Sequence, residues 1–127
     1  MGNTINLTID MNFIPLASPD IQEQDIDALR KVLLTGMLVQ GAQVETLEKN
    51  IAAFTNSKHV IATSNGTSTM HMALLALGIG NGDEVIVPAF SYIATANVVE
   101  LVGATPVFVD IDNNTFNIDV SKIEAAI

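Results

Sequence analysis

From residue 58 onward, short apolar runs rich in β-branched residues alternate with stretches of helical composition. Helices are predicted at residues 67–77 and 93–101, between and after these runs. Strands that alternate with helices form right-handed βαβ units, which build a parallel sheet. The sequence therefore predicts an α/β fold, with a mostly parallel sheet flanked by helices. The three apolar runs are the predicted strands: residues 59–63, 84–87 and 106–109.

The N-terminal part of the chain has a purely helical pattern. Apolar residues at helical spacing predict amphipathic helices at residues 22–34 and 42–54, separated by a loop between Gly36 and Gly41. Residues 1–11 are polar and irregular, and we interpret them as an extension. We therefore expect three segments: an N-terminal extension at 1–11, a helical segment at 12–57 and an incomplete α/β domain at 58–127.

The α/β part is expected to belong to something larger. Three parallel strands leave two open edges and two faces to cover, and the last predicted helix starts at Asp119 and is cut at Ile127. Charged residues make up only 15% of the chain, against about 25% in an ordinary soluble domain. We expect the front of a larger domain, a surface covered by a partner, or both.

Composition argues against several classes of function. Five Lys and Arg residues stand against 14 Asp and Glu, a net charge of −9, so a nucleic-acid surface or an anionic membrane surface is not expected. The absence of cysteine excludes disulfides, zinc–thiolate sites and a cysteine nucleophile. No apolar run approaches the roughly 18 residues that span a bilayer, and no signal-peptide pattern is present. We expect a cytoplasmic protein.

The junction between the first predicted strand and its helix is a candidate anion site. Residues 64–68 read Ser-Asn-Gly-Thr-Ser, and a helix N-terminus presents unpaired N–H groups and the positive end of the helix dipole. The amides of Gly66, Thr67 and Ser68 therefore suit a phosphate. The alternative is an N-cap and turn, for which the same residue types are preferred. Neither a P-loop nor a Rossmann glycine pattern is present.

A second candidate loop, Pro-Ala-Phe-Ser-Tyr at residues 88–92, follows the second predicted strand. In open parallel sheets, ligands bind outside the carboxyl ends of the strands, so this loop is expected on the same rim as Gly66. Tyr92 is the only tyrosine, and its ring suits stacking on an aromatic cofactor. The alternative is that Phe90 and Tyr92 are packing residues at a helix entry.

No catalytic residue and no metal site are predicted in the chain. Residues from Asp110 begin like a calcium loop, but Thr115 stands where that loop needs glycine and Ser121 where it needs glutamate. We interpret Asp110 as a turn residue. His59 and His71 are single histidines, which are usually structural. No lysine falls in an apolar pocket at a strand end, where desolvation would lower its pKa; the four are Lys31, Lys49, Lys58 and Lys122.

Taken together, these residues resemble the DegT/StrS family of pyridoxal-phosphate-dependent sugar aminotransferases. The resemblance covers residues 12–127 and is most specific between Ser64 and Asp112. The matching segments are F-I-P-L-A-S-P, G-x-L-V-Q-G at 36–41, S-N-G-T-S-T-M-H-M-A-L-L-A-L-G-I-G-N-G-D-E-V-I-V-P-A-F-S-Y-I-A-T-A-N at 64–97, G-A-T-P-V-F-V-D-I-D, and I-E-A-A-I at 123–127.

The resemblance implies the N-terminal part of the large domain of a fold-type-I enzyme, in a dimer with active sites at the subunit interface. It implies transfer of an amino group from glutamate to a nucleotide-linked keto sugar, in the biosynthesis of cell-surface polysaccharides or deoxyaminosugars. It also implies that Gly66, Thr67 and Ser68 surround the phosphate of pyridoxal 5′-phosphate (PLP) and that Tyr92 stacks on its pyridine ring.

The same resemblance places the family's Schiff-base lysine, and the aspartate that pairs with the pyridine nitrogen, after the last residue of this chain. The 127-residue chain alone is therefore expected to be inactive and to bind the cofactor weakly. Three alternatives remain open: a PLP-dependent sugar dehydratase of the same fold, a truncated interaction or regulatory module, and a nucleotide-binding Rossmann domain, which lacks its glycine pattern.

Overall fold

A computed structural model describes residues 14–127 of the chain. The chain divides into two compact units, one ending at Gln43 and the other spanning Val44–Ile127. Each unit is described by itself. The extension expected at residues 1–11 lies outside the described residues.

The first unit contains helix α1 (Glu23–Thr35), which confirms the helix predicted at residues 22–34. Its start is fixed by Asp25, whose Oδ2 accepts a hydrogen bond from the amide of Gln22 at 2.9 Å. Its end is fixed by Gly36, which adopts the left-handed conformation (φ 70°) that a non-glycine residue adopts only at a cost. Helix α2 (Ala42–Thr55) begins at the end of this unit and continues into the second.

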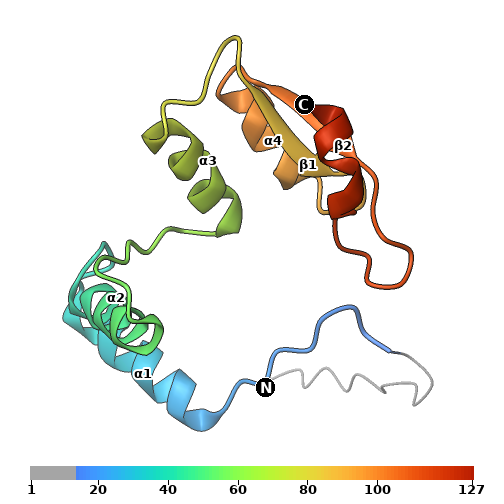
Figure 1. Cartoon of the computed structure of the whole chain (residues 1–127). Helices are drawn as coiled ribbons and strands as arrows, with labels where there is room; N and C mark the ends of the chain where they lie inside the picture. Colours follow the sequence, from blue (N-terminus) through green and yellow to red (C-terminus); the bar gives the residue numbers. More distant parts are fainter. Residues whose placement is uncertain (1–13) are drawn as a thin grey trace, which may run out of the picture. The chain divides into compact units, whose positions relative to one another are not determined.

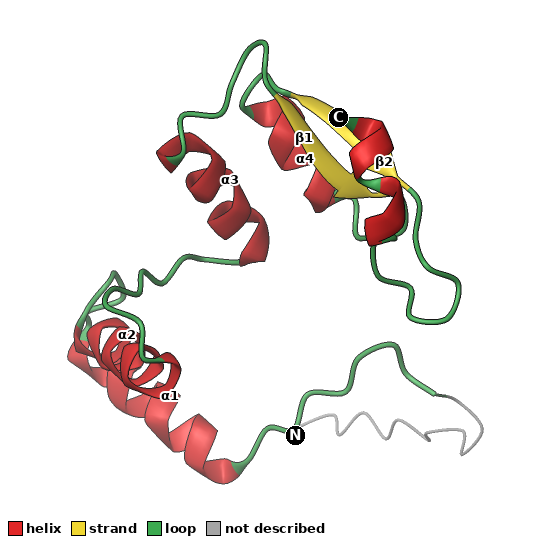
Figure 2. Cartoon of the chain, viewed as in Figure 1, coloured by secondary structure: helices red, strands yellow, loops and turns green. Residues whose placement is uncertain are grey.

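The second unit contains a two-stranded parallel sheet and the helices around it (Figures 1 and 2). Strand β1 (Glu84–Pro88) pairs in parallel with β2 (Thr105–Val109), from Glu84 opposite Thr105 to Pro88 opposite Val109. Helix α4 (Ala94–Leu101) connects the two strands and contacts both. Helix α3 (Gly66–Ala76) precedes β1 and contacts α4. These elements confirm the predicted α/β fold with a parallel sheet.

The core of this unit lies between α4 and the strands. Val98 and Val99 of α4 are the largest fully buried side chains, and Val99 packs with Val87 of β1 and with Ala104. Apolar side chains from α3, β1 and the loops complete the cluster: Leu74, Val85, Ile79 and Val102. This packing fixes α4 against both strands, and Leu74 attaches the carboxyl-terminal part of α3 to the same cluster.

The strand predicted at residues 59–63 does not form, and this prediction is wrong for the described chain. The segment is irregular, and Ile61 remains 72% exposed. A strand needs a neighbour for its backbone N–H and C=O groups, and the described sheet has only β1 and β2. The amide of Ala62 instead donates to Glu48 Oε1 of α2 at 2.8 Å.

The α-helix predicted from Asp119 is also wrong, because the segment forms two single 3₁₀ turns, η1 (Val120–Lys122) and η2 (Glu124–Ala126). Asp119 caps the first turn as a helix-starting aspartate does, since its Oδ1 accepts from the amide of Ser121 at 3.0 Å. The backbone bonds that follow span three residues rather than four, as in the bond from Lys122 N to Asp119 O at 3.0 Å. Such tight turns are frequent at helix starts.

Candidate cofactor-phosphate site

The two candidate loops open on the same side of the second unit. Figure 1 shows the amino ends of α3 and α4 on the side where β1 and β2 end. Gly66 starts α3, and Tyr92 lies two residues before α4. The two loops therefore share one side of the unit, but only the Tyr92 loop follows a strand of the described sheet, because the strand expected before Gly66 does not form.

The start of α3 has two backbone N–H groups without an acceptor. The side chain of Asn65 accepts from the amide of Ser68 at 2.9 Å, and the Asn65 carbonyl accepts from the amide of Thr69 at 3.1 Å. The amides of Gly66 and Thr67 donate to no group among residues 14–127. These donors sit at the positive end of an 11-residue helix, which suits an anion.

Hydroxyl groups surround these amides. Ser64 Oγ lies 3.2 Å from Ser68 Oγ, and Thr63 Oγ1 lies 2.5 Å from Thr69 Oγ1. The hydroxyl of Thr67 has no partner within the described part of the chain, and the residue is exposed. The cap interpretation therefore holds for Asn65, and the amide of Ser68, which was expected to face a phosphate, is occupied by this cap. Thr67 keeps its hydroxyl free for a ligand.

Gly66 is not required by the backbone or by packing in this structure. Its φ is not positive, and a Cβ added to it would meet nothing within 4 Å. A glycine without either constraint often marks a place where a ligand approaches the backbone closely. Neither the backbone angle nor the packing explains the glycine at position 66, which favours a ligand there. The sequence alone does not reveal this.

Tyr92 is held through its backbone and exposed through its side chain. Its carbonyl accepts from the amide of Thr95 at 3.0 Å, and the hydroxyls of Ser91 and Thr95 lie 2.9 Å apart. The side chain is 78% exposed. Phe90, in contrast, contacts the ring of Phe116, with the centroids 5.9 Å apart. Phe90 is itself 66% exposed, so the packing interpretation applies to it only through this ring contact, and Tyr92 has no ring contact within the described unit.

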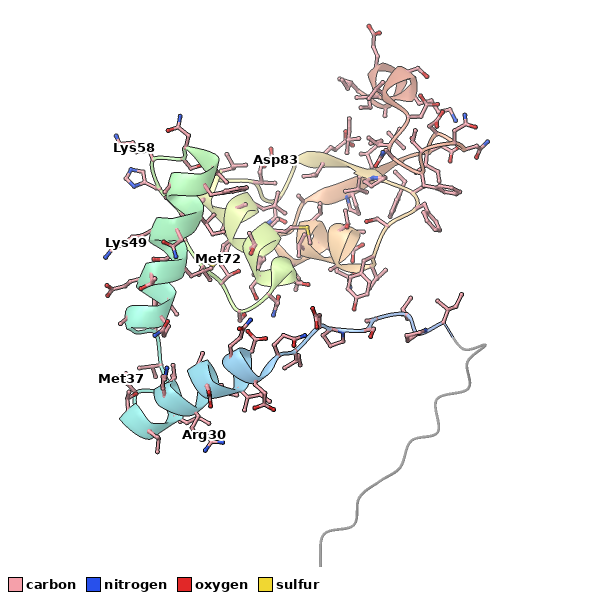
Figure 3. All side chains as sticks on the ribbon, turned by 90° about the horizontal axis from the view of Figure 1, so that it is seen from below. Arg30, Met37, Lys49, Lys58, Met72 and Asp83 are labelled. Carbon is pink, nitrogen blue, oxygen red and sulfur yellow. The ribbon has the colours of Figure 1, made fainter. Side chains whose placement is uncertain are left out.

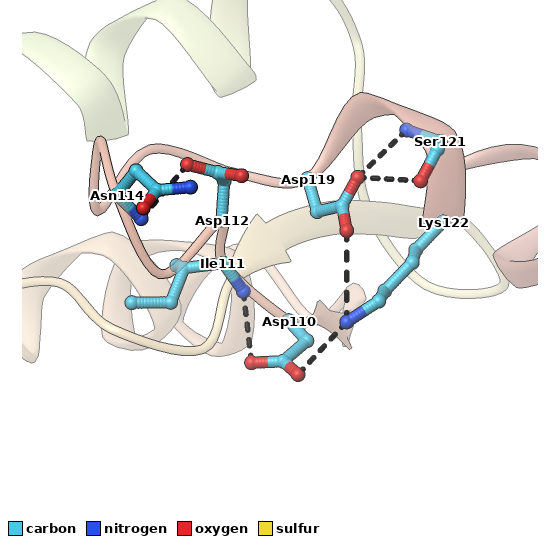
Figure 4. A network of polar contacts seen from close by, with 7 residues as sticks. All are labelled: Asp110, Ile111, Asp112, Asn114, Asp119, Ser121 and Lys122. Carbon is cyan, nitrogen blue, oxygen red and sulfur yellow. Dashed lines mark hydrogen bonds and ion pairs between the residues drawn. The ribbon is translucent and has the colours of Figure 1, made fainter.

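Lys122 forms an ion-pair network that sequence reasoning did not identify (Figure 4). Its Nζ lies 3.0 Å from Asp110 Oδ2 and 3.6 Å from Asp119 Oδ2. The hydrogen bond to Asp110 raises the pKa of Lys122, which keeps the amine protonated and not nucleophilic. Asp110 is a turn residue as interpreted, since its Oδ1 accepts from the amide of Ile111 at 2.8 Å. The Asp119–Lys122 pair has the local i,i+3 spacing, but no local signal predicts the pair of Lys122 with Asp110, twelve residues away.

The network makes the stability of the Asp110–Lys122 segment dependent on pH. The hydrogen bond from Lys122 lowers the pKa of Asp110, and the hydroxyl of Ser121 lowers that of Asp119. A carboxyl whose pKa is lower in the folded protein stabilises the fold at pH values above its pKa in the unfolded chain. This stabilisation is lost as the pH falls through its pKa in the folded protein. The stabilisation by Lys122, whose pKa is raised, is lost only as the pH rises through that pKa. The network therefore contributes fully to stability between about pH 4 and pH 10.

We therefore expect Lys122→Met to reduce the free energy of unfolding at pH 7 and to have a smaller effect in acid, as the pH falls through the lowered pKa values of Asp110 and Asp119. Urea unfolding of the wild type and the variant across this range measures the difference. A difference that stays constant from pH 2 to pH 7 would show that the carboxylates do not stabilise the turn through Lys122.

Among residues 14–127 there is no group of three or more His, Cys, Asp or Glu side chains that could hold a metal ion. No helix in the same residues is both long enough and apolar enough to cross a bilayer.

The model of one protein family matches most of the chain. That family is the DegT/DnrJ/EryC1/StrS aminotransferase family, and the match covers residues 19–127. The chain belongs to this family. This match includes the segments from Ser64 to Asp112 on which the resemblance to the family rests.

Curated relatives in the DegT family include sugar-modifying enzymes. The chain is 44% identical over 115 residues to UDP-4-amino-4-deoxy-L-arabinose–oxoglutarate aminotransferase of Shewanella sediminis. It is also 44% identical over 116 residues to the spore coat polysaccharide biosynthesis protein SpsC of Bacillus subtilis. Each match covers 91% of this chain and 30% of the relative. The chain thus spans about a third of the length of these relatives.

Solved structures of DegT family members share the fold. Spr1654 of Streptococcus pneumoniae, provisionally named a sugar aminotransferase and solved in its PMP form, matches with a TM-score of 0.84 and 38% identity. The match covers 90% of this chain and 29% of that one. The GDP-4-keto-6-deoxy-D-mannose-3-dehydratase of E. coli with hydrated PLP matches with a TM-score of 0.81 and 33% identity, over 89% and 31%. The fold is therefore that of the fold-type-I PLP enzymes, as expected.

Proposed function

We propose that this chain provides the phosphate cradle and the ring platform for PLP in a sugar aminotransferase. The observation that carries the proposal is the pair of unpaired amides, Gly66 and Thr67, at the start of α3, together with the exposed side chain of Tyr92 just before α4. We define the phosphate cradle as Gly66, Thr67 and Ser68.

The residues of the cradle fit the chemistry of a phosphate ester. Two free N–H groups and the free hydroxyl of Thr67 supply donors, and the helix supplies the positive end of its dipole. No cation of the chain is required for this, which agrees with its few basic residues. The open space at Gly66 lets a phosphate oxygen approach the backbone. The exposed ring of Tyr92 fits the flat face of a pyridine.

PLP, when bound, supplies an electron sink for reactions at the carbon that carries the amino group. The chain's own residues bind and orient it. The cradle would hold the phosphate, and Tyr92 would cover one face of the ring and exclude water from it. A cofactor held both at its phosphate and on one face of its ring would present its reactive group in one orientation. This lowers the entropic part of the barrier.

The amino donor is proposed to be glutamate and the acceptor a nucleotide-linked keto sugar. The oxoglutarate and the UDP-sugar in the name of the Shewanella relative support this choice. The setting is proposed to be cell-surface polysaccharide or deoxyaminosugar biosynthesis in the cytoplasm, with the protein as a homodimer. The many exposed apolar side chains support a partner surface; those of the second unit include Phe54, Ile61 and Leu77.

None of the lysines of this chain is proposed as the covalent anchor of the cofactor. Lys122 is paired with two aspartates. Lys49 and Lys58 point away from the ribbon in Figure 3, and Lys49 lies 3.9 Å from Glu45. We propose instead, from the resemblance to the family, that the anchoring lysine lies beyond the residues of this chain.

Amino-group transfer is the reaction that tests the proposal. We expect the protein in its full natural length to convert glutamate and a UDP-linked 4-keto sugar into 2-oxoglutarate and the amino sugar. We expect the 127-residue chain alone to form neither product. Mass spectrometry of the sugar, with enzymatic detection of 2-oxoglutarate, measures both. Turnover by the 127-residue chain would contradict the assignment of the anchoring lysine, and no amino transfer by the natural protein would contradict the proposed reaction.

A sugar dehydratase is the second candidate, because a dehydratase with bound PLP shares this fold at 33% identity. The same assay separates the two reactions. A dehydratase removes water from the keto sugar and leaves no nitrogen on the carbon skeleton, whereas an aminotransferase replaces the keto oxygen with nitrogen. Loss of water from the sugar without gain of nitrogen would favour the dehydratase.

A further inference from the structure

We propose that Phe116 is a positioning residue that holds the Tyr92 loop, acting through Phe90. The inference rests on the proposed function in one respect, that Tyr92 faces the cofactor ring. The loop in question is residues 89–92, which connects β1 to α4. Phe116 belongs to a different segment, the turn that follows β2.

The turn after β2 is built to hold its shape. Ile111 and Ile118 form an antiparallel bridge. Asp112 closes the loop between them, because its amide donates to Asn117 O at 2.9 Å and its carbonyl accepts from the amide of Phe116 at 2.8 Å. The side chain of Asp112 also accepts hydrogen bonds from two amides of the turn at 2.9–3.0 Å, and these bonds lower its pKa.

Phe116 occupies a backbone conformation that does not suit it. Its φ is 58°, in the left-handed region where glycine and asparagine are favoured and bulky residues are strained. A glycine at this position would form the turn with less strain. What phenylalanine adds is its ring, and the ring contact the structure shows for it is with Phe90, at 5.9 Å and 48° between the planes. The strain therefore points to a role for this contact.

Phe90 lies between two anchored residues. The amide of Ala89 donates to Val109 O at 2.8 Å, which extends the β1–β2 pairing by one residue. The hydroxyl of Ser91 lies 2.9 Å from that of Thr95 in α4. Phe116 supplies the anchor for Phe90, so that each residue leading to Tyr92 has its own contact. Release of Phe90 leaves the middle of this short loop unrestrained.

The turn itself is tied to the end of β2 by Lys122. Lys122 bridges Asp110, the residue after β2, and Asp119, the residue before η1 (Figure 4). The amide of Asp119 also donates to Asp110 O at 2.9 Å. Each ion pair is exposed and weak by itself, but together with the backbone bond they join the two ends of the turn that carries Phe116.

Phe116→Leu and Phe116→Tyr in the natural protein test this inference. Leucine keeps an apolar side chain and removes the ring, while tyrosine keeps the ring. We expect Phe116→Leu to speed amide hydrogen exchange at residues 89–93 of the cofactor-free protein, and to weaken PLP binding, each by about two- to tenfold. We expect Phe116→Tyr to keep both the exchange rate and the PLP affinity of the wild type. Phe108→Leu is the matched control, because Phe108 is equally exposed (60% against 59%) and lies in β2.

The circular dichroism of bound PLP reports the orientation of its ring and should change in Phe116→Leu but not in Phe108→Leu. Unchanged exchange at residues 89–93 in Phe116→Leu overturns the inference. Faster exchange with unchanged PLP affinity and dichroism overturns the positioning role as well. If the wild type does not bind PLP at all, the proposed function fails, and the exchange data still decide whether Phe116 holds the loop.

Discussion

Gly66→Ala is expected to leave the cofactor-free protein as stable as the wild type and to weaken PLP binding by about ten- to a hundredfold. The expectation combines two observations: a Cβ at Gly66 meets nothing within 4 Å, and the amides of Gly66 and Thr67 are unpaired. The methyl group would occupy the space that a phosphate oxygen needs. The loss of one charge-assisted hydrogen bond costs about 1.5–3 kcal/mol, which corresponds to that range of affinity.

Fluorescence titration with PLP and urea unfolding without it measure the two halves of this prediction. Gly80→Ala is a suitable control, because Gly80 also has no positive φ and its added Cβ would make an ordinary contact with Val102 O at 3.4 Å. It lies in the turn between α3 and β1, at the opposite ends of these elements. Equal PLP affinity in Gly66→Ala and the wild type would remove Gly66 from the cradle.

Tyr92→Ala is expected to weaken PLP binding by about five- to a hundredfold, because an aromatic ring stacked on a flat heterocycle contributes about 1–3 kcal/mol. The free energy of unfolding should change by less than about 0.5 kcal/mol, since a side chain this exposed makes few contacts. Tyr92→Phe retains the ring and should bind PLP nearly as well as the wild type.

The ratio of the two Tyr92 variants separates stacking from hydrogen bonding by the phenol. Isothermal titration of PLP into each cofactor-free variant gives the affinities. If Tyr92→Phe loses as much affinity as Tyr92→Ala, the hydroxyl and not the ring is responsible, and the proposed platform is wrong. If neither variant loses affinity, Tyr92 does not contact the cofactor.

Elements whose signals are local could be predicted from the sequence. Helices α1 to α4 follow from apolar spacing and from caps such as Asn65 and Gly36. Strands β1 and β2 follow from their β-branched runs, and their parallel pairing follows from the helix between them. The position of the Tyr92 loop at the carboxyl end of β1 follows from the same topology, whereas the strand expected before Gly66 does not form.

Features that depend on a distant partner could not be predicted. Residues 59–63 have the composition of a strand, but composition does not supply the neighbour that a strand needs, and Ala62 binds Glu48 instead. The ion pair of Lys122 with Asp110 and the ring contact of Phe116 with Phe90 join segments that are separated along the chain. The availability of the Gly66 and Thr67 amides also required the structure, because a cap and an anion site share the same residue types.

The central claim is that the start of α3 binds the phosphate of PLP. Its most direct test compares the affinities of PLP and of pyridoxal, which lacks the phosphate, in the wild type and in Gly66→Ala. We predict that the wild type binds PLP much more tightly than pyridoxal, and that Gly66→Ala weakens PLP binding while leaving pyridoxal binding unchanged. Equal losses for both ligands would contradict the claim, because the substitution would then act on something other than the phosphate.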